Sequence, residues 1–351
     1  MIEQLVLKNF TILPDGVWHF GSGLNVIIGE NGVGKTHLLK LLYTLLKVQA
    51  DTKVLNKTTL ERAYGQKLIG VFRPERLGRL VTRKRGRERC EITLEMKSEE
   101  WNTQIAFATN AKSQVEVLRV PAHPLPASPV YFPPRELMTF YPWFISIYQN
   151  FETAFEETWC DTLILLGAPL LRGRGAEKVA TMLEPLEEAL GGKVESDQQT
   201  GRFYLKSPGE GRMEMPLVAE GWCKLAQLVR LISTGTLLEQ GYLFWDEPEA
   251  NLNPRLIKVV ARSIVTLAAS GVQVFLATHS LFLLRELEIL LQSPSYHDVG
   301  RRWMALARRD GTVVLEQSDH VDGIQTIVVL EEMLEQSDRF LSATEELIVE
   351  E

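Results

Sequence analysis

The sequence predicts an α/β fold with a mostly parallel core sheet flanked by helices, an antiparallel side sheet and a helical insert. Almost wholly apolar strands at residues 24–28, 242–245 and 272–277 alternate with helical patterns. Such alternation is typical of a parallel sheet that is covered on both faces. A glycine-rich loop joins the first strand to a leucine-rich helix at residues 36–47. Because the strands come from both ends of the chain, the middle must be inserted into the sheet domain.

The composition is that of an ordinary soluble protein of 351 residues, with 45% hydrophobic and 24% charged side chains. Its net charge of −7 argues against a general polyanion binder. The three cysteines share no CxxC spacing, which argues against a zinc site or a disulfide framework. No apolar run is long enough to span a bilayer, and Met1 leads into a strand-like pattern instead of a signal peptide. We therefore expect a cytoplasmic protein that has no membrane partner.

Strand patterns dominate the first part of the chain. They lie at residues 2–11, 17–20, 24–28, 80–82, 90–96, 105–108, 115–120 and 130–132. Those between residues 80 and 120 are separated by short polar turns, which predicts the antiparallel side sheet. Prolines break up residues 121–129, so we expect a loop there.

The remaining chain divides into a helical part and a second α/β part. Residues 137–190 are helical in pattern with two glycine-containing breaks, and residues 193–206 resemble a hairpin. From residue 218 onwards helices and strands alternate. We predict an ATP-binding lobe at 1–136, an insert at 137–211 and a second part of the same ATPase domain at 212–351, with helices at its C-terminal end.

The glycine loop has the pattern of a phosphate cradle. Its residues are Gly29, Glu30, Asn31, Gly32, Val33, Gly34, Lys35 and Thr36, and His37 follows them as a further candidate for nucleotide binding. In such a loop the backbone N–H groups and the helix N-terminus bind phosphate oxygens. Lys35 would neutralise the β- and γ-phosphates, and the Thr36 hydroxyl would bind Mg²⁺. A chance match is the alternative, which the strand before the loop and the helix after it make less favourable.

Two carboxylates end the apolar strand at residues 242–245. Asp246 would hold Mg²⁺, and Glu247 would orient or deprotonate the attacking water. The next strand ends at Thr278 and His279, which places His279 where it can reach the γ-phosphate. A solvated turn and an ordinary surface histidine are the respective alternatives.

These segments resemble the ABC class of ATPases. The GENGVGKT loop, the WDEPEANLNP segment and the LATHS strand end are similar to the SMC/RecF/OLD-like branch of bacterial AAA family ATP-binding proteins. The resemblance covers residues 1–48 and about 212–285 well. It implies a P-loop NTPase fold of the ABC-ATPase type, with ATP and Mg²⁺ as cofactors. It also implies a homodimer in which the phosphate loop of one chain and a signature motif of the other hold each ATP.

The signature motif and the glutamine that such proteins carry after a core strand are both altered. The signature candidate is at residues 218–222, where Gly221 fits but Ala219 stands in place of the expected hydroxyl residue. Lys224 could compensate, or the segment could be a plain helix start. The place of the glutamine is taken by residues 130–136. Arg135, Glu136 or the more distant Gln66 could take over the role of the glutamine. Alternatively, the two prolines in this segment form only a rigid exit from the strand.

A basic segment and an aromatic stripe have no role assigned by these motifs. The basic side chains are Arg73, Arg76, Arg79, Arg83, Lys84, Arg85, Arg87 and Arg89. They fit DNA or RNA phosphates, an acidic partner surface or a solvated turn. The stripe consists of Trp143, Phe144, Tyr148, Phe151, Phe155 and Trp159, for which we favour a place in the core over an interface.

The resulting functional hypothesis is an ATP-hydrolysing ABC-type ATPase that dimerises around ATP and drives or gates a partner. By analogy with the family, DNA repair and phage defence are the expected settings, and an effector such as a nuclease is the expected partner. The alternative is a slow or non-hydrolysing ATP-dependent switch that holds a complex together. A transporter subunit is disfavoured by the missing glutamine and the altered signature.

Overall fold

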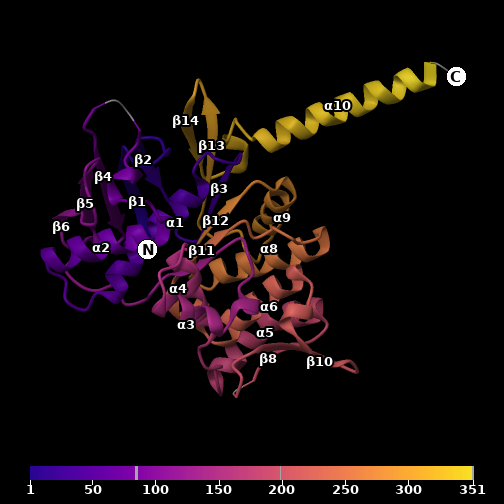
Figure 1. Ribbon diagram of the computed structural model, residues 1–351. Helices are drawn as coiled ribbons and strands as arrows, with labels where there is room; N and C mark the ends of the chain where they lie inside the picture. Colours follow the sequence, from indigo (N-terminus) through magenta and orange to yellow (C-terminus); the bar gives the residue numbers. More distant parts are fainter. Residues whose placement is uncertain (84–85, 198, 350–351) are drawn as a thin grey trace.

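A mixed sheet of six strands forms the centre of the computed structural model, which describes residues 1–83, 86–197 and 199–349 (Figure 1). The strand order is β14-β13-β3-β12-β11-β7. Neighbouring strands pair in parallel except for β14, which runs antiparallel to β13 at one edge. The strands are β3 (Leu24–Gly29), β7 (Val130–Phe132), β11 (Tyr242–Asp246), β12 (Gln273–Thr278), β13 (Arg301–Arg309) and β14 (Thr312–Ser318). The parallel core sheet predicted from the apolar strands is confirmed.

Both faces of this sheet are covered, so every residue of β3, β11 and β12 is buried. Successive side chains of a strand point to opposite faces. Leu243 and Trp245 accordingly pack in the same cluster as residues of α6 (Glu220–Ser233), α8 (Pro254–Ala269) and α9 (Leu281–Leu291). Phe244 belongs to the other cluster, with α1 (Lys35–Asp51) and α2 (Lys57–Phe72). The central strands thus separate two hydrophobic cores.

The antiparallel side sheet is also confirmed. Its order is β2-β1-β4-β5-β6, formed by β1 (Ile2–Lys8), β2 (Gly16–His19), β4 (Arg89–Met96), β5 (Thr103–Ala108) and β6 (Glu116–Arg119). One predicted strand is wrong. Leu80 ends a short 3-10 helix, Leu77–Leu80, and residues 81–82 contribute only a single bridge between Val81 and Phe10. Leu77 and Leu80 are buried in this turn, so their apolar character reflects packing and not strand pairing.

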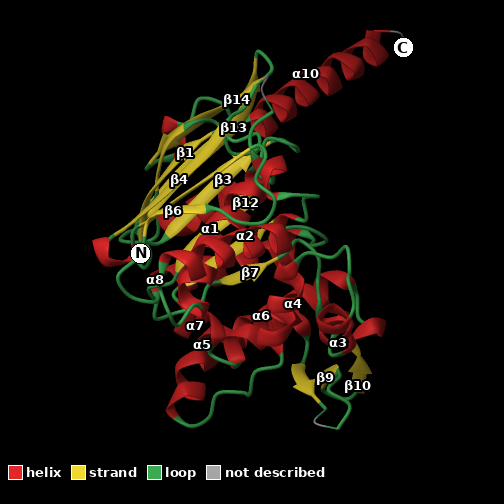
Figure 2. Ribbon diagram, turned by 60° about the vertical axis from the view of Figure 1, so that its left-hand side comes forward, coloured by secondary structure: helices red, strands yellow, loops and turns green. Residues whose placement is uncertain are grey.

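The helical insert consists of α3 (Trp143–Asn150), α4 (Glu157–Leu166) and α5 (Arg174–Leu190) and lies beside α6 (Figure 2). The predicted hairpin is present as β8 (Lys193–Ser196) and β9 (Phe203–Ser207), and β10 (Gly211–Glu214) adds a third strand. The core assignment of the aromatic stripe holds for Phe144, which is buried, but Trp143, Phe151 and Phe155 are exposed. Tyr148 and Trp159 are partly buried and pack against the same core cluster, so the stripe has three packed members and an exposed flank.

Buried polar contacts attach the insert to α1 and α2. Lys67 of α2 lies 2.8 Å from Glu157 and 2.6 Å from Asp161 of α4, measured from Nζ to a carboxylate oxygen. The hydroxyl of Tyr43 on α1 donates to the same Asp161 carboxylate at 2.6 Å. Burial lowers the pKa of Lys67, but attraction by Asp161 and Glu157 outweighs it and raises the pKa overall. The phosphate-loop helix and the insert are thereby held in one arrangement.

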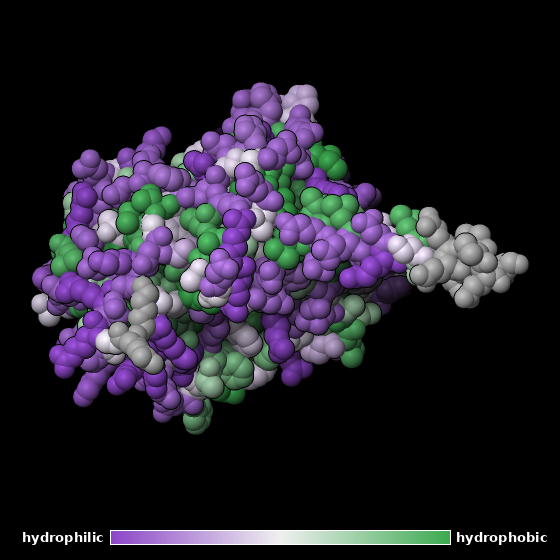
Figure 3. Space-filling view, turned by 90° about the horizontal axis from the view of Figure 1, so that it is seen from above, coloured by the Kyte–Doolittle hydropathy of each residue, from purple (hydrophilic) through white to green (hydrophobic). Residues whose placement is uncertain are grey.

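One feature near the C-terminal end, a hairpin, was missed by sequence analysis. The strands β13 and β14 form a hairpin whose two turn residues, Asp310 and Gly311, have φ of 48° and 75°. Asp-Gly between two strand patterns is the characteristic signal of such a turn, and it was available in the sequence. The helix α10 (Val328–Val349) projects from the body of the molecule (Figure 1). From above, the molecular surface is mainly hydrophilic with small apolar patches (Figure 3).

Among the described residues, no helix combines the length and the apolar character needed to cross a membrane.

Candidate functional site

The glycine loop runs from the end of β3 to the start of α1. Gly34 has φ of 100°, in the left-handed region that favours glycine, and a Cβ there would lie 2.7 Å from Leu13 Cδ2. A Cβ at Gly29 would lie 2.3 Å from the carbonyl oxygen of Leu306. No side chain caps the N-terminus of α1. The first turn of α1 therefore offers its free N–H groups to an anion.

Of residues 29–37, which are predicted to bind nucleotide, all except Gly29 and Val33 line one hollow. Glu30, Asn31, Gly32, Gly34, Lys35, Thr36 and His37 line a hollow of about 240 Å³, together with Ile12 and Glu247. Val33 instead packs its side chain into the core, where it is 1% exposed. Its place in the loop is therefore explained by packing.

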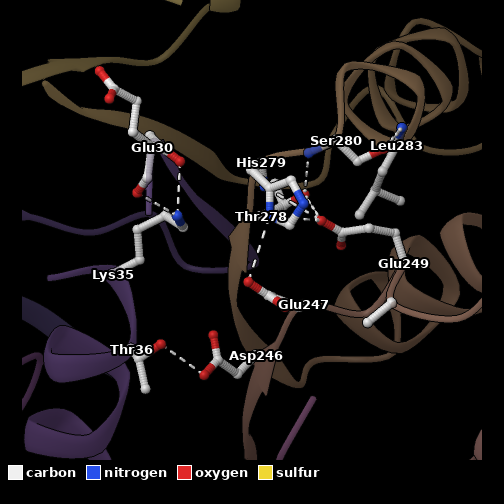
Figure 4. Close-up of polar contacts among 12 residues, drawn as sticks. Glu30, Lys35, Thr36, Asp246, Glu247, Glu249, Thr278, His279, Ser280 and Leu283 are labelled. Atoms are coloured by element: carbon white, nitrogen blue, oxygen red, sulfur yellow. Dashed lines mark hydrogen bonds and ion pairs between the residues drawn. The ribbon is translucent and has the colours of Figure 1, made fainter. Parts of the chain in front are cut away.

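The Lys35 ammonium group is held by two carbonyl oxygens of the glycine loop. Its Nζ donates to the carbonyl oxygens of Gly29 at 2.7 Å and Glu30 at 2.8 Å (Figure 4). Burial lowers its pKa, and the nearby carboxylates of Glu247 and Asp246 oppose this effect. A bound phosphate would give the partly buried ammonium group the negative partner that these carbonyl groups supply only in part.

Thr36 and Asp246 meet although they are 210 positions apart in the sequence. The Thr36 hydroxyl donates to Asp246 Oδ2 at 2.8 Å, and the Tyr131 hydroxyl lies 3.4 Å from the same oxygen. The second carboxylate oxygen, Oδ1, is buried without a hydrogen-bond partner in the described structure. Burial raises the pKa of Asp246 to about 6, partly offset by the Thr36 hydrogen bond. A cation at this position would relieve the cost of burying the carboxylate.

This donor set fits Mg²⁺ in complex with a nucleotide. Magnesium is usually bound by one or two protein oxygens together with waters and phosphate oxygens. Thr36 and Asp246 supply two such protein oxygens. The described residues contain no cluster of three or more His, Cys, Asp or Glu side chains that could hold a metal ion. Phosphate oxygens and waters would therefore have to complete the coordination.

Glu247 is held through its backbone, and its carboxylate faces His279. Its φ of 47° is unusual for a residue other than glycine. Its N–H donates to the Ala277 carbonyl oxygen at 2.9 Å, and its own carbonyl oxygen accepts from Lys224 Nζ at 2.5 Å. Residues held in such backbone conformations concentrate at functional sites. The turn points the Glu247 carboxylate towards the end of β12.

His279 stands beside this carboxylate, as predicted. Its Nδ1 lies 3.4 Å from Glu247 Oε1 and 3.9 Å from Glu249 Oε1 (Figure 4). Glu249 is 8% exposed and accepts hydrogen bonds from the Thr278 hydroxyl at 2.6 Å and the His279 N–H at 3.3 Å. Its other oxygen has no partner in the described structure. Sequence analysis gave Glu249 no role, although its position three residues after Asp246 was visible.

Three neighbouring hollows that share lining residues form a series along the loop. A cavity of about 750 Å³, lined mainly by apolar groups, shares Ile12 and His37 with the hollow at the phosphate loop. The loop hollow in turn shares Thr36 and Glu247 with a third cavity of about 650 Å³. The hollow at the phosphate loop therefore lies between the two larger cavities.

The signature candidate has a structural role within its own chain. A Cβ at Gly221 would lie 2.5 Å from the carbonyl oxygen of Asn251, so the glycine permits α6 to pack against the loop after β11. Ala219 occupies the N-cap of α6 and offers no side-chain hydrogen bond. Lys224 is 2% exposed, and burial lowers its pKa to about 8. Its ammonium group donates to the carbonyl oxygens of Glu247 and Ala250 of its own chain, so Lys224 would have to give up these bonds to contact a nucleotide.

Of the three candidates for the missing glutamine, only Arg135 lies free in the site. Gln66 is exposed on α2 and lines a different hollow, of about 250 Å³. The Glu136 carboxylate accepts hydrogen bonds from Thr139 within its own turn. Arg135 lines the 650 Å³ cavity together with Thr36, Asp246 and Glu247.

The basic segment is partly neutralised. Arg79 pairs with Glu75, Arg89 pairs with Glu91 and Glu116, and Arg73 donates to the Thr153 carbonyl oxygen. Lys84 and Arg85 lie outside the described residues. Arg76, Arg83 and Arg87 are exposed and form no ion pair with a described residue. Arg79 and Arg83 also line the 750 Å³ cavity, so part of the segment faces the nucleotide series.

Comparison with known proteins identifies a family and two relatives. A family model described as "AAA domain, putative AbiEii toxin, Type IV TA system" matches residues 24–285. A stretch of 44 residues, 12% of each chain, is 50% identical to the DNA replication and repair protein RecF of Pediococcus pentosaceus. A stretch of 64 residues is 39% identical to the DNA double-strand break repair Rad50 ATPase of Thermococcus kodakarensis. It spans 18% of this chain and 7% of Rad50.

Solved structures show the same fold. The head domain of an Smc protein bound to the C-winged helix domain of ScpA superposes with a TM-score of 0.58 at 13% identity, covering 93% of this chain and 99% of the other. An Smc head with an extended coiled coil, bound to the C-terminal domain of ScpA derived from Pyrococcus furiosus, gives a TM-score of 0.53 at 14% identity. That superposition covers 97% of this chain and 99% of the other.

Proposed function

The chain belongs to this AAA-domain family and is an SMC/RecF-like ATPase of the ABC type, and from that premise we propose that it hydrolyses ATP between two copies of itself. ATP with Mg²⁺ is the proposed substrate complex. The proposal assigns phosphate binding to the loop at residues 29–36, metal binding to Thr36 and Asp246, and water activation to Glu247 and His279.

One observation carries the proposal. Asp246 ends β11, and Thr36 and His279 follow the carboxyl ends of β3 and β12; these strands are neighbours in the parallel sheet. In open α/β sheets, ligands bind outside the carboxyl ends of the strands. The 2.8 Å contact between Thr36 and Asp246 joins the phosphate loop to the carboxylate strand at the position where a metal-bound phosphate would lie.

Each side chain then has a chemical task. Bound Mg²⁺ would neutralise phosphate charge, as in other P-loop enzymes. Lys35 exchanges its two carbonyl partners for phosphate oxygens. Glu247 orients the attacking water and accepts its proton, and the neighbouring His279 ring holds the Glu247 carboxylate in place. The backbone bonds of Glu247 to Ala277 and Lys224 keep this base in a fixed position.

We place the nucleoside in the 750 Å³ cavity. Its walls include Ile12, Leu13 and Val313, which suit the faces of a base. His37 is half-buried, and its Nδ1 is buried without a hydrogen-bond partner among the described residues. Burial lowers the pKa of the ring below its ordinary value of 6.5, so the ring is neutral at physiological pH. A neutral ring can accept or donate one hydrogen bond to the nucleoside.

The second copy is proposed to close the site from the side of the 650 Å³ cavity. The start of α6 contributes Glu220 to that cavity, and Asn251 lies next to it with φ of 63°. In this arrangement Gly221 reaches the nucleotide of the other copy through its backbone, after Asn251 has moved. A partner such as an effector nuclease, in DNA repair or phage defence, would recognise the closed, ATP-bound dimer. The names of the RecF and Rad50 relatives and the family description support these settings.

A second candidate function is a switch that binds ATP and hydrolyses it slowly or not at all. Ala219 favours it, because the N-cap of α6 lacks the hydroxyl that would contact a γ-phosphate. Hydrolysis would then be weak although ATP still holds two copies together.

Turnover measurements on purified protein distinguish the two. Under the first proposal, wild-type protein hydrolyses ATP with Mg²⁺, and Glu247→Gln accumulates an ATP-bound dimer that light scattering detects. Lys35→Ala, which removes the phosphate ligand, is the matched control. Wild-type turnover equal to that of Lys35→Ala, with an ATP-dependent dimer, would select the switch; the absence of both would refute both proposals.

A further inference from the structure

Residues 133–136 follow β7, and the sheet anchors the N-terminal end of this segment. Phe132 pairs with Trp245 in register, and their rings stack at a centroid distance of 4.5 Å. Pro133 and Pro134 follow, so φ is restricted at two successive positions. Since Asp246 follows Trp245 directly, the exit of β7 lies beside the end of the carboxylate strand.

The other end of the segment is held by α6. The Leu137 N–H donates to Gln227 Oε1 at 2.8 Å, and both residues are buried. Between Pro134 and Leu137, the Glu136 carboxylate is hydrogen-bonded within its own turn, where its Oε1 accepts from the Thr139 hydroxyl at 2.5 Å. Arg135 therefore lies on a segment that is anchored at one end beside the carboxylate strand and at the other end to the signature-like helix α6.

The Arg135 side chain itself is uncommitted. It is exposed and makes no ion pair with any described residue, although Glu156, Glu220, Asp246 and Glu247 line the same cavity. The other cation of this cavity, Lys40, is already paired with Glu156. A free guanidinium group at the far side of Thr36 and Glu247 lies beyond the position proposed for the last phosphate.

We propose that Arg135 binds the γ-phosphate of ATP and thereby reports its presence to α6 through Leu137 and Gln227. This inference rests on the proposed nucleotide site. A guanidinium group matches phosphate oxygens with two parallel N–H donors, which suits a terminal phosphate with three free oxygens. Charge that develops on that phosphate during hydrolysis would strengthen the contact, so Arg135 would also stabilise the transition state.

Nucleotide discrimination tests the contact. Affinities for ATP and ADP with Mg²⁺ are measured by titration calorimetry in the Glu247→Gln background, with and without Arg135→Ala. Because ADP lacks the γ-phosphate, we expect about a tenfold or larger loss of ATP affinity and less than a twofold change for ADP. Arg135→Lys should recover part of the loss. Arg62→Ala, at an exposed arginine of α2, is the matched control and should change neither affinity.

Equal losses for ATP and ADP, or no loss of ATP affinity, would overturn the role of Arg135. In the background that retains Glu247, Arg135→Ala should lower kcat about 100-fold; wild-type kcat in that variant would also overturn it. Failure of the wild-type protein to hydrolyse ATP, with discrimination still dependent on Arg135, would refute the proposed hydrolysis and leave the γ-phosphate contact standing.

Discussion

The nucleotide edge of the sheet and the contact between the insert and α2 are both rich in buried charge, yet they are built in opposite ways. At the insert contact, Lys67 meets two carboxylates at 2.8 Å or less, so its charge is compensated within the protein. At the nucleotide edge, Asp246 Oδ1 and Glu249 Oε2 are buried without partners in the described structure. Glu247 there also holds an unfavourable backbone conformation. The first region stabilises the fold, whereas the second is left incomplete until a ligand arrives.

The largest expected effect lies at the nucleotide edge. Glu247→Gln should lower kcat about 1000-fold, because the amide cannot accept the proton of the attacking water. ATP affinity should stay close to that of the wild type, since the substitution leaves the phosphate loop intact. Steady-state turnover and nucleotide titration measure the two quantities. Glu332→Gln, at an exposed position of α10, is the control; a similar loss of kcat there, or none at Glu247, would remove the base assignment.

Breaking the compensated region should cost folding stability. Lys67→Ala leaves Glu157 and Asp161 without their cation, and we expect the free energy of unfolding to fall by about 2–4 kcal/mol. Arg119→Ala, which removes an exposed ion pair with Glu99, should cost at most about 1 kcal/mol. Urea unfolding followed by circular dichroism compares them. An equal loss in the free energy of unfolding for both variants would mean that the buried ion pairs of Lys67 contribute no more to stability than the exposed pair of Arg119.

At the nucleotide edge, removing a buried charge should raise the free energy of unfolding of the ligand-free protein. Burial raises the pKa of Asp246 from 3.8 to about 6, so the folded protein binds the proton more tightly than the unfolded chain. Stability is therefore lost as pH rises from about 4 to 6, and Asp246→Asn avoids that loss. At pH 7.5 without Mg²⁺ or nucleotide, the variant should be more stable by about 1–3 kcal/mol, which corresponds to about 1–4 °C in Tm.

Thermal unfolding at pH 7.5 and near pH 4 checks this sign, because the gain should vanish at the lower pH. A variant that is less stable than the wild type at pH 7.5 would show that the Thr36 and Tyr131 contacts outweigh the burial of the charge.

The smallest expected effect concerns the basic segment. If Arg76 and Arg87 hold nucleic-acid phosphates, charge reversal at both should weaken DNA or RNA binding severalfold and make its salt dependence shallower by about two phosphate contacts. Filter binding over a range of salt concentrations measures the slope. Arg308→Glu, at another exposed arginine, is the control. Wild-type protein without salt-sensitive binding would leave the acidic-partner and solvated-turn interpretations.

The elements that could be predicted from the sequence are those with a local sequence signal. The glycine loop, the leucine-rich helix after it and the apolar strands were predictable, because their spacing is set by backbone geometry within a few residues. The hairpin at Asp310-Gly311 carried an equally local signal that was not used. Residues 80–82 were misread because burial in a turn and burial in a strand produce the same short apolar run.

The sequence by itself determined the phosphate loop, the carboxylate pair and the alternation that predicts a parallel sheet. Only the tertiary structure decided what each side chain touches. It buried Asp246 with an unpartnered oxygen, committed Lys224 to its own chain and left Arg135 free. The physical reason is that these properties depend on pairings between residues far apart in the chain, such as Thr36 with Asp246, which no local pattern encodes.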